Sequence, residues 1–397
     1  MNIKKITDGV IYTGVNDRDT VKFENLWPIP HGVSYNSYLV KGSDKTAIID
    51  TVETSSSHRY ITVIKSALAE SEPDYLIVNH MEPDHSGSIP ELVCHFPSIK
   101  VVGNKQTLAM IKGYYGIDDS RFMEIKDGDE INLGDKTLKF VLTPMVHWPE
   151  TMVTYLKEDK MLFSGDAFGT FGALNGGVID EGIDTSIYFD EMYRYYSNIV
   201  GKYGKFVQKA LDKLKGIDIE YICPTHGPVW HSKIKEVSEI YNRLSLYQNE
   251  PGVTIVYGTM YGNTQDMVEA IASRLSERGI KNIRIHNASK SDMSYIISDA
   301  FRFEGLIVGS PTYCMKLFPP VEEFMIAMET REVKNKVLAT FGAYTWSPCV
   351  NAKLKEFSAR MDMPILTSLD MKQSFSETTQ EEAIALADKV YEALKMK

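Results

Sequence analysis

The pattern of apolar and polar positions changes near residue 250. Before that point, short apolar runs alternate with turns, and they predict strands at 36–42, 45–51, 75–80, 100–103, 138–144, 161–166 and 221–227. After it, apolar runs alternate with amphipathic helical segments, which is typical of parallel βαβ units. The strands predicted there are 253–258, 303–310 and 336–343, and the helices are 264–279, 320–330 and 351–361.

A domain boundary is predicted where these two patterns of apolar and polar positions meet. The helical segment 233–247 ends in polar residues. Pro251-Gly252 follows, a dipeptide that typically marks a turn or loop, and a predicted strand then starts at Val253. A chain of 397 residues is also too long for one ordinary core. We therefore expect two domains, residues 1–250 and 251–397.

Composition and charge narrow the class of protein. A hydrophobic content of 43% and a charged content of 24% are those of a soluble globular chain. A net charge of −10 argues against nucleic acid or an anionic membrane surface as the partner. The start of the chain lacks the apolar core of a signal peptide, and no stretch has the length of a membrane span. These features predict a cytoplasmic protein.

The four cysteines are Cys94, Cys223, Cys314 and Cys349, and none forms a CxxC pair. That spacing argues against a zinc knuckle and against a rubredoxin-type or other cysteine-ligated iron site. Each cysteine lies in or beside apolar sequence, so we expect buried, reduced thiols.

Potential metal ligands gather at the ends of predicted strands. Residues 80–85 place two imidazoles and two carboxylates in one short turn, where they would repel or stay unsatisfied without a cation. Three more candidates follow later strands or lie in turns rich in Gly or Pro. The predicted ligands are His80, Glu82, Asp84, His85, His147, Asp166 and His226.

Seven ligands are too many for one four-coordinate ion and suit two adjacent ions with one bridging carboxylate. Three carboxylates without a thiolate favour iron or manganese. A single histidine at a strand end is more often an ordinary hydrogen-bonded residue, so the prediction depends on the packed turn. His95 is expected in the core or on a helix face, whereas His31 and His231 could lie behind the ligands.

Residues 255–267, IVYGTMYGNTQDM, read as a strand, a loop of small and hydroxyl residues, and a helix. A helix N-terminus with such a loop is an anion site. The sequence has no GxxxxGK[ST] motif, which argues against binding of nucleoside triphosphates, and no GxGxxG motif, which argues against binding of dinucleotides. Two later loops, GSPTYCM at 309–315 and GAYTWSP at 342–348, follow buried-looking strands. The predicted cofactor contacts are Thr259, Met260, Tyr261, Gly262, Asn263, Thr264, Ser310, Pro311, Thr312, Tyr313, Gly342, Ala343, Tyr344 and Trp346.

These motifs resemble a known family over nearly the whole chain. HMEPDH, with His147, Asp166 and His226 at their intervals, is similar to the metallo-β-lactamase-type fold. Zinc hydrolases of that fold have histidine where Glu82 stands, and glutamate there resembles the flavodiiron proteins, or A-type flavoproteins. The later loops resemble flavodoxin, which binds FMN. The resemblance implies an α/β multidomain protein, in which a metallo-β-lactamase-like αββα sandwich precedes a flavodoxin-like doubly wound parallel sheet.

The resemblance also implies an oxidoreductase with FMN and two iron ions. It assigns His80, Glu82 and His147 to one iron and Asp84, His85 and His226 to the other, with Asp166 as the bridge. It implies an external electron donor, such as rubredoxin or a reduced flavin-type carrier, and reduction of O₂ to water or of NO to N₂O. The implied assembly is a head-to-tail homodimer or a tetramer.

Two other functions stay open from the residues alone. One is a zinc-dependent hydrolase of the metallo-β-lactamase fold with a flavodoxin-like module, and the other is an electron carrier whose metal domain is structural. Tyr193, Tyr195 and Tyr196 suit an aromatic wall or a proton source near the metals, or simple helix packing. The sequence ranks neither O₂ against NO nor one electron donor against another.

Overall fold

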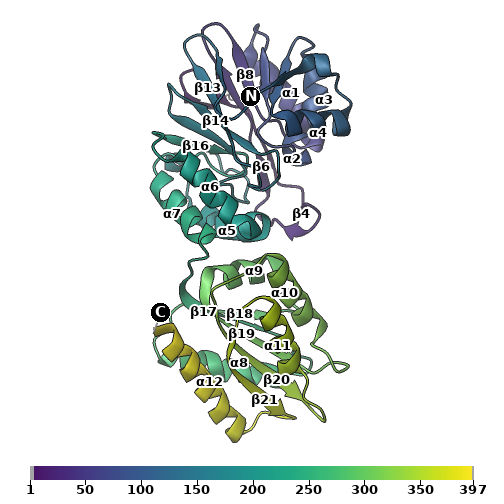
Figure 1. Cartoon of the computed structure of the whole chain (residues 1–397), viewed down its shortest axis with the longest axis vertical. Coiled ribbons are helices and arrows are strands. Elements are labelled where there is room, and N and C mark those ends of the chain that lie inside the picture. Colours follow the sequence, from purple (N-terminus) through teal and green to yellow (C-terminus); the bar gives the residue numbers. More distant parts are fainter. Residues whose placement is uncertain (1–3, 396–397) are drawn as a thin grey trace. The chain divides into compact units, whose positions relative to one another are not determined.

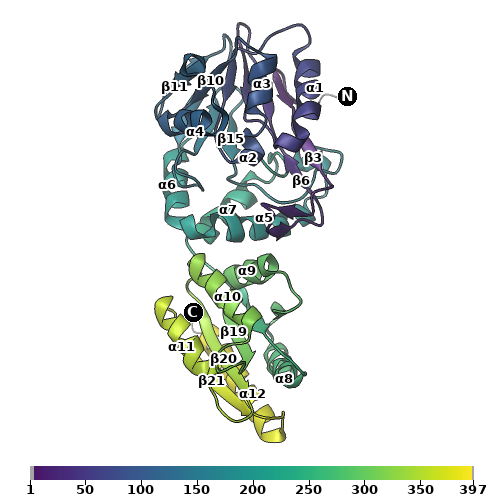
Figure 2. The ribbon, with the colours of Figure 1, turned by 90° about the vertical axis from the view of Figure 1, so that its right-hand side faces the viewer.

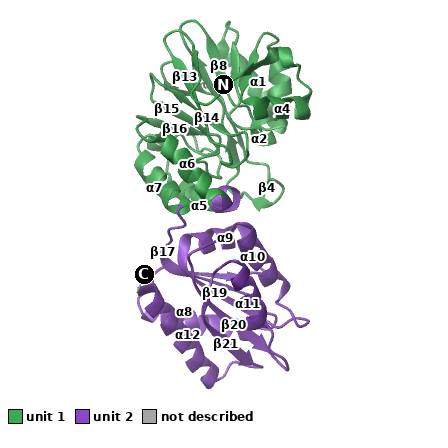
Figure 3. Ribbon diagram, in the orientation of Figure 1, with its two compact units in different colours: residues 1–196, 203–245 green, residues 197–202, 246–397 purple. Residues whose placement is uncertain are grey.

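The computed structural model describes residues 4–395, which divide into two compact units (Figure 3). The first unit comprises the chain up to residue 196 together with 203–245. The second comprises 197–202 and the chain from residue 246 onward. In residues 4–395, no helix is both long enough and apolar enough to cross a bilayer.

The first unit contains a seven-stranded sheet in the order β1-β2-β7-β8-β9-β10-β11. Its strands are β1 (Lys4–Thr7), β2 (Val10–Tyr12), β7 (Tyr38–Lys41), β8 (Thr46–Ile49), β9 (Tyr75–Ile77), β10 (Lys100–Gly103) and β11 (Phe122–Glu124). Strands β8 to β11 run parallel, which requires a crossover between successive strands. The helices in these crossovers are α1 (Ser57–Leu68), α2 (Pro83–Ser86), α3 (Ile89–His95) and α4 (Lys105–Tyr115).

A second, five-stranded sheet of this unit has the order β12-β13-β14-β15-β16. Its strands are β12 (Glu130–Asn132), β13 (Thr137–Leu142), β14 (Met152–Leu156), β15 (Met161–Gly165) and β16 (Tyr221–Pro224). Every residue of β14 and β15 is buried, as expected for strands covered on both faces. The accompanying helices are α5 (Ser186–Tyr195), α6 (Gly204–Leu214) and α7 (Ile234–Ser245).

The two sheets lie between outer helices, with α1, α3 and α4 on one side and α6 and α7 on the other (Figures 1 and 2). Two small hairpins complete the unit, β3 (Val15–Asp17) with β6 (Val33–Tyr35) and β4 (Lys22–Phe23) with β5 (Trp27–Pro28). This is the layered αββα arrangement that the sequence predicted.

A buried polar link joins the two sheets beside the predicted ligands. Asn79 follows β9, and its backbone N–H and side-chain amide donate to the Asp50 carboxylate at 2.7 and 3.0 Å. The Thr154 hydroxyl on β14 donates to Asn79 Oδ1 at 2.7 Å, and the Met152 N–H donates to the Asn79 carbonyl at 3.0 Å. Because His80 is the next residue, this link fixes the first ligand relative to the second sheet.

The second unit is a five-stranded parallel sheet in the order β18-β17-β19-β20-β21. Its strands are β17 (Glu250–Tyr257), β18 (Ile283–Asn287), β19 (Phe303–Pro311), β20 (Val337–Tyr344) and β21 (Ile365–Lys372). Its helices are α8 (Asn263–Glu277), α9 (Met293–Arg302), α10 (Pro319–Thr330), α11 (Val350–Arg360) and α12 (Glu377–Lys395). Helices α8 and α12 pack together in one apolar core with the sheet. The strand order reverses direction at β17, which places a ligand crevice at the carboxyl ends of β17 and β19.

The predicted start of the first strand of the second unit was wrong. Strand β17 begins at Glu250 rather than at Val253, and Pro251 and Gly252 lie inside it at an irregularity of its pairing with β19. A proline cannot donate to the ladder, so it is tolerated where the pairing is already interrupted.

The prediction of buried thiols was also wrong for most of the cysteines. Only Cys223, on β16, is buried, whereas Cys94 and Cys314 are exposed and Cys349 is partly exposed. On α3 the buried positions are Ile89 and Leu92, and Cys94 is on the opposite face. Apolar neighbours in sequence therefore did not indicate which helix face the thiol occupies.

We expect Asn79→Ala to lower the free energy of unfolding of the first unit by about 2–4 kcal/mol, because the substitution leaves Asp50 and Thr154 without their buried partner. The matched control is Asn132→Ala on the exposed side of β12, where the amide oxygen accepts the exposed Gly134 N–H at 2.8 Å, and we expect it to change stability by less than about 1 kcal/mol. Guanidinium denaturation of the full chain measures both. Equal losses in the two variants would show that the link does not stabilise the unit.

Candidate metal centre and flavin site

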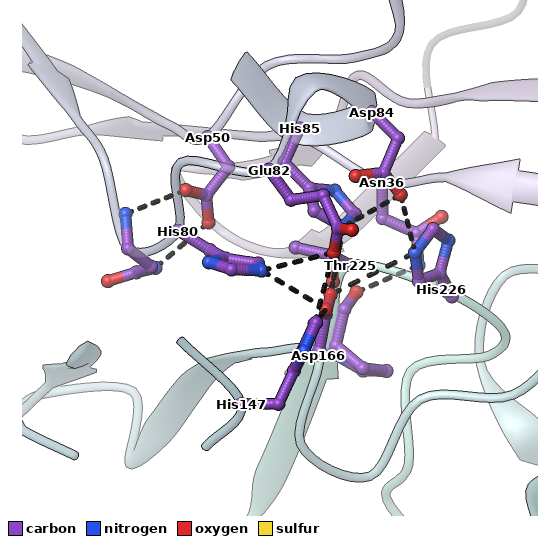
Figure 4. Close-up of polar contacts among 12 residues, drawn as sticks. Asn36, Asp50, His80, Glu82, Asp84, His85, His147, Asp166, Thr225 and His226 are labelled. Carbon is purple, nitrogen blue, oxygen red and sulfur yellow. Dashed lines mark hydrogen bonds and ion pairs between the residues drawn. The ribbon is translucent and has the colours of Figure 1, made fainter. Parts of the chain in front are cut away.

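All seven predicted metal ligands lie together in the first unit (Figure 4). They form two groups, and within each group one nitrogen or oxygen atom per residue lies within 4.8 Å of the others. The first group is His80, Glu82, His147 and Asp166, and the second is Asp84, His85 and His226. Residues from four separate segments of the chain thus converge on one place.

Strand ends and one short helix explain this convergence. His80 follows β9, Asp166 follows β15 and His226 follows β16, all at carboxyl ends of strands. Pro83 occupies the first turn of α2 after Glu82, and this turn directs Asp84 and His85 to the same place. Loops on a rigid sheet can aim side chains in this way without disturbing the core.

Asp166 lies between the two groups. Its Oδ2 is 3.1 Å from His147 Nε2 and 3.5 Å from His80 Nε2, whereas its Oδ1 is 2.8 Å from His85 Nε2. Glu82 Oε2 completes the first group at 3.0 Å from His147 Nε2. Asp84 Oδ2 completes the second at 3.1 Å from both His85 Nε2 and His226 Nε2. One carboxylate therefore presents one oxygen to each group.

The electrostatics of the cluster demand positive charge. Burial alone would lower the pKa of His85, but Asp84 and Asp166 raise it to about 10. Burial likewise opposes protonation of His147, yet Asp166 and Glu82 raise its pKa to about 9. Against the effect of burial, the neighbouring imidazoles lower the pKa of Asp166 well below its usual value. The cluster is stable only with bound protons or bound cations.

The donor set fits metal ions. Both ring nitrogens of His85 and Nε2 of His226 are buried and lack a hydrogen bond within residues 4–395, although carboxylate oxygens lie 2.8–3.1 Å from their Nε2 atoms. Imidazole nitrogens and carboxylate oxygens that approach each other without hydrogen-bond geometry are typical of ligands around a cation. Four imidazoles and three carboxylates suit iron, manganese or zinc.

A second layer of residues orients these ligands by hydrogen bonds, and the sequence did not predict these residues. His80 Nδ1 donates to Glu150 at 2.8 Å, and His226 Nδ1 donates to the Ser34 carbonyl at 2.7 Å, so both imidazoles turn Nε2 toward the cluster. The Thr225 hydroxyl donates to Asp166 Oδ1 at 2.6 Å. Glu150 could have been predicted as a hydrogen-bond partner of a ligand, because it is an acidic residue that lies three residues after His147 and just before an apolar strand. A carbonyl partner such as that of Ser34 leaves no sequence signal.

Hairpin β4–β5 lies against the same cluster. The Phe23 ring is 5.3 Å from the His226 ring, and Trp27 donates to Glu24 at 3.0 Å. Burial and the neighbouring Glu82 raise the pKa of Glu24 to about 7. No motif in the sequence indicated that this hairpin folds over the ligands.

The three tyrosines singled out in α5 and just after it have different surroundings. Tyr195 is fully buried, and its ring centroid is 5.5 Å from that of His226. Burial, and to a smaller extent the charge of Asp166, raises the pKa of Tyr195 well above its usual value. Tyr196 packs on Tyr241, and the Arg243 guanidinium contacts the Tyr193 hydroxyl. Tyr195 thus forms an aromatic wall of the cluster.

The histidines at positions 231, 95 and 31 lie outside the two ligand groups. His231 stacks on Tyr221 at 4.3 Å and pairs with Glu181 at 3.2 Å. His95 lies on an exposed face of α3 and pairs with Glu91. His31 is exposed. The residues that hydrogen-bond to predicted ligands are instead Glu150, Ser34 and Thr225.

A cavity of about 430 Å³ lies at the carboxyl ends of β17, β19, β20 and β21 in the second unit. It is bounded by the three predicted loops, and eleven of the fourteen predicted contacts line it. The exceptions are Gly262, Ser310 and Gly342. Gly262 caps α8 with φ +103°, whereas a Cβ at Gly342 would lie 2.8 Å from Val350. These glycines shape the backbone instead of facing the cavity.

Five lining residues were missed: Cys314, Met315, Thr345, Ser347 and Gln373. Gln373 follows β21 at the same sheet edge and was detectable from that position. The cavity fits a flat aromatic cofactor with a phosphate. Tyr313, Tyr344 and Trp346 offer rings, and the N-terminus of α8 offers backbone N–H groups.

Each of the two units matches the model of a known family. Residues 33–227 match the ODP family beta lactamase model, and residues 255–385 match the flavodoxin model. The chain is 32% identical to the anaerobic nitric oxide reductase flavorubredoxin of Escherichia coli over 86% of its own length and 72% of that protein.

Two solved structures are similar over almost the full chain. Rubredoxin oxygen:oxidoreductase from Desulfovibrio gigas is 27% identical with a TM-score of 0.94, covering 100% of this chain and 99% of that one. A variant of the flavo di-iron protein of Thermotoga maritima is 28% identical with a TM-score of 0.89, covering 98% and 99%. The predicted combination of a metallo-β-lactamase-like and a flavodoxin-like domain is confirmed.

We expect Glu150→Gln to weaken metal binding about 10–100-fold, because the amide loses the charge that orients His80 and raises its basicity. Anaerobic competition with a chelator, read as metal content against chelator concentration, measures the effect. The matched control is Glu158→Gln, whose exposed carboxylate accepts a backbone N–H of β13. Unchanged affinity in Glu150→Gln would mean that this residue has no influence on the ion.

Proposed function

The chain belongs to the flavodiiron protein family, and we propose on that basis that it reduces O₂ to water, NO to N₂O, or both. Its cofactors are FMN and two iron ions. The observation that supports this function best is Asp166, one carboxylate with an oxygen toward each of two ligand groups. The flavodoxin match in the same chain accounts for the supply of electrons.

We assign the ligands by group. His80, Glu82 and His147 would bind one iron, Asp84, His85 and His226 would bind the other, and Asp166 would bridge them. Glu82 favours iron over zinc because it contributes a hard anionic oxygen. Residues 1–250 would form the metal domain and residues 251–397 the FMN domain.

When bound, FMN and the irons supply the redox chemistry, and the chain's own residues control its surroundings. Glu150 and the Ser34 carbonyl keep His80 and His226 in the tautomer that directs Nε2 inward. The rings of Phe23 and Tyr195 cover the second ligand group and limit access of water to it. The Tyr195 hydroxyl remains protonated at neutral pH because burial and Asp166 raise its pKa, so the ring that lies beside His226 carries a hydrogen-bond donor.

We propose that electrons arrive from an external donor, such as rubredoxin or a reduced flavin-type carrier. The sequence has no CxxC pair that could form an internal rubredoxin-type site. Free thiols at all four cysteines fit a reducing compartment, and we propose a cytoplasmic location.

We further propose a head-to-tail homodimer, alone or paired into a tetramer, in which the flavin of one chain faces the metals of the other. At the rim of the flavin cavity, Tyr261 is 93% exposed and Trp346 is 86% exposed. Exposed aromatic residues at the rim of a cofactor site are typical of a surface that a partner covers. Two-fold closure would give two composite sites per dimer.

The function is tested by cofactor and gas assays on protein from iron-supplemented cells. We expect about two irons and one FMN per chain, and consumption of O₂ or NO by the reduced protein. Glu82→His should lower iron content and gas reduction while FMN content is unchanged. Zinc without iron, together with no reduction of either gas, would favour the hydrolase alternative.

Complementation tests the dimer. His80→Ala with His147→Ala should lose iron and keep FMN, and Thr259→Ala with Thr264→Ala should lose FMN and keep iron. Each homodimer should be inactive. Mixed dimers purified through two different affinity tags should recover one of their two sites, because the intact flavin of one chain faces intact irons of the other. Mixed dimers that contain both cofactors yet reduce neither gas would show that each chain works alone.

A further inference from the structure

A small cavity lies between helix α6 and the second sheet of the first unit. Its volume is about 20 Å³. One wall is formed by α6, including Val207 and Ala210, and the opposite wall includes Val153 on β14. A cavity of this size has room for one water-sized or slightly larger molecule.

The walls of this cavity are apolar. Eight of its ten lining residues have pure hydrocarbon side chains, and the other two are Thr143 and Tyr241. A water molecule needs two to four polar partners, so a cavity with such walls stays dry. Small apolar molecules, in contrast, lose little on leaving water and gain dispersion contacts inside.

Two of the segments that line the cavity also supply metal ligands. Val146 precedes His147, and Ala167 follows Asp166, so both segments that supply these ligands also line the cavity. Neighbouring Cα atoms are only about 3.8 Å apart. Phe168, the next residue, also lines the cavity, and its ring centroid is 4.5 Å from that of Tyr241.

The outer end of the cavity is near solvent. Leu211 and Leu214 on α6 also line it, and both are partly exposed, whereas Val146, Phe168 and Tyr241 are buried. A line of apolar side chains therefore extends from the surface along α6 to the segments that contain His147 and Asp166.

We propose that this cavity is a binding site for a diatomic gas, from which the gas reaches the metal centre. The inference rests on the proposed function for the identity of the gas, O₂ or NO. These molecules are small and apolar, and the cavity offers them a dry, apolar site next to two ligand segments. Ala167 and Ala210 leave this space open, since a larger side chain at either position would project into it.

Xenon tests the site without any catalysis, because it is an apolar probe of similar size. Crystals of the holoprotein pressurised with xenon should show an ordered atom between Ala210 and Val153. Ala210→Leu should abolish that xenon peak, since its added carbons occupy the space. Val153→Ile fills the cavity from the sheet side and serves as a second variant if Ala210→Leu folds poorly.

Steady-state kinetics then test whether gas bound in the cavity takes part in the reaction. In Ala210→Leu, the KM for the gas should rise about fourfold, as expected when one methylene-sized apolar contact is lost, while kcat at saturating gas is unchanged. Iron and FMN content should equal those of the wild type. The matched control, Lys209→Leu, adds a leucine on the exposed side of the same helix and should leave both KM and xenon binding unchanged.

The outcomes separate this inference from the proposed function. Absence of xenon from the wild-type cavity overturns the inference, and so does an unchanged KM in a variant that excludes xenon. A holoprotein that reduces neither gas contradicts the proposed function instead, and the xenon peak then decides alone whether the cavity binds apolar gas.

Discussion

The structure of the first unit depends on one constraint, which is that three carboxylates and four imidazoles share a buried space. Such a cluster is stable only when positive charge balances it, and only when each side chain is held at a fixed angle. The Asp50–Asn79–Thr154 link between the sheets and the outer partners Glu150 and Ser34 meet the second requirement. The packing of the two sheets, the geometry of the ligand loops and the binding of ions therefore depend on one another.

Much of this arrangement was predictable because the relevant signals are local. The ligands follow apolar runs, and the flavin loops follow strands of a βαβ pattern, so position along the chain indicates position at a sheet edge. Glu82 needed no tertiary information to suggest iron. Of the fourteen residues predicted to contact the flavin, eleven line the cavity. Gly262 and Gly342 shape the backbone instead, and the buried Ser310 hydroxyl accepts the Phe318 N–H.

The rest depends on contacts between distant segments, which periodicity does not reveal. The Ser34 carbonyl contacts His226 across 192 residues, and a backbone atom has no residue type to recognise. Hairpin β4–β5 contains only two-residue strands, too short for an alternating pattern. Residues 197–202 belong to the second unit although they lie between helices of the first, and Cys94 occupies an exposed helix face within an apolar run.

The contact between Ser34 and His226 also bears on the order of events during synthesis. The earliest ligand, His80, leaves the ribosome long before His226, which is the last, and the Ser34 carbonyl that orients His226 is made before either. The second ligand group lacks His226, and Asp166 lacks the Thr225 hydroxyl that orients it, until β16 has been translated and has paired with β15. Metal insertion into both positions is therefore a late step, which follows the folding of nearly the whole first unit and does not nucleate it.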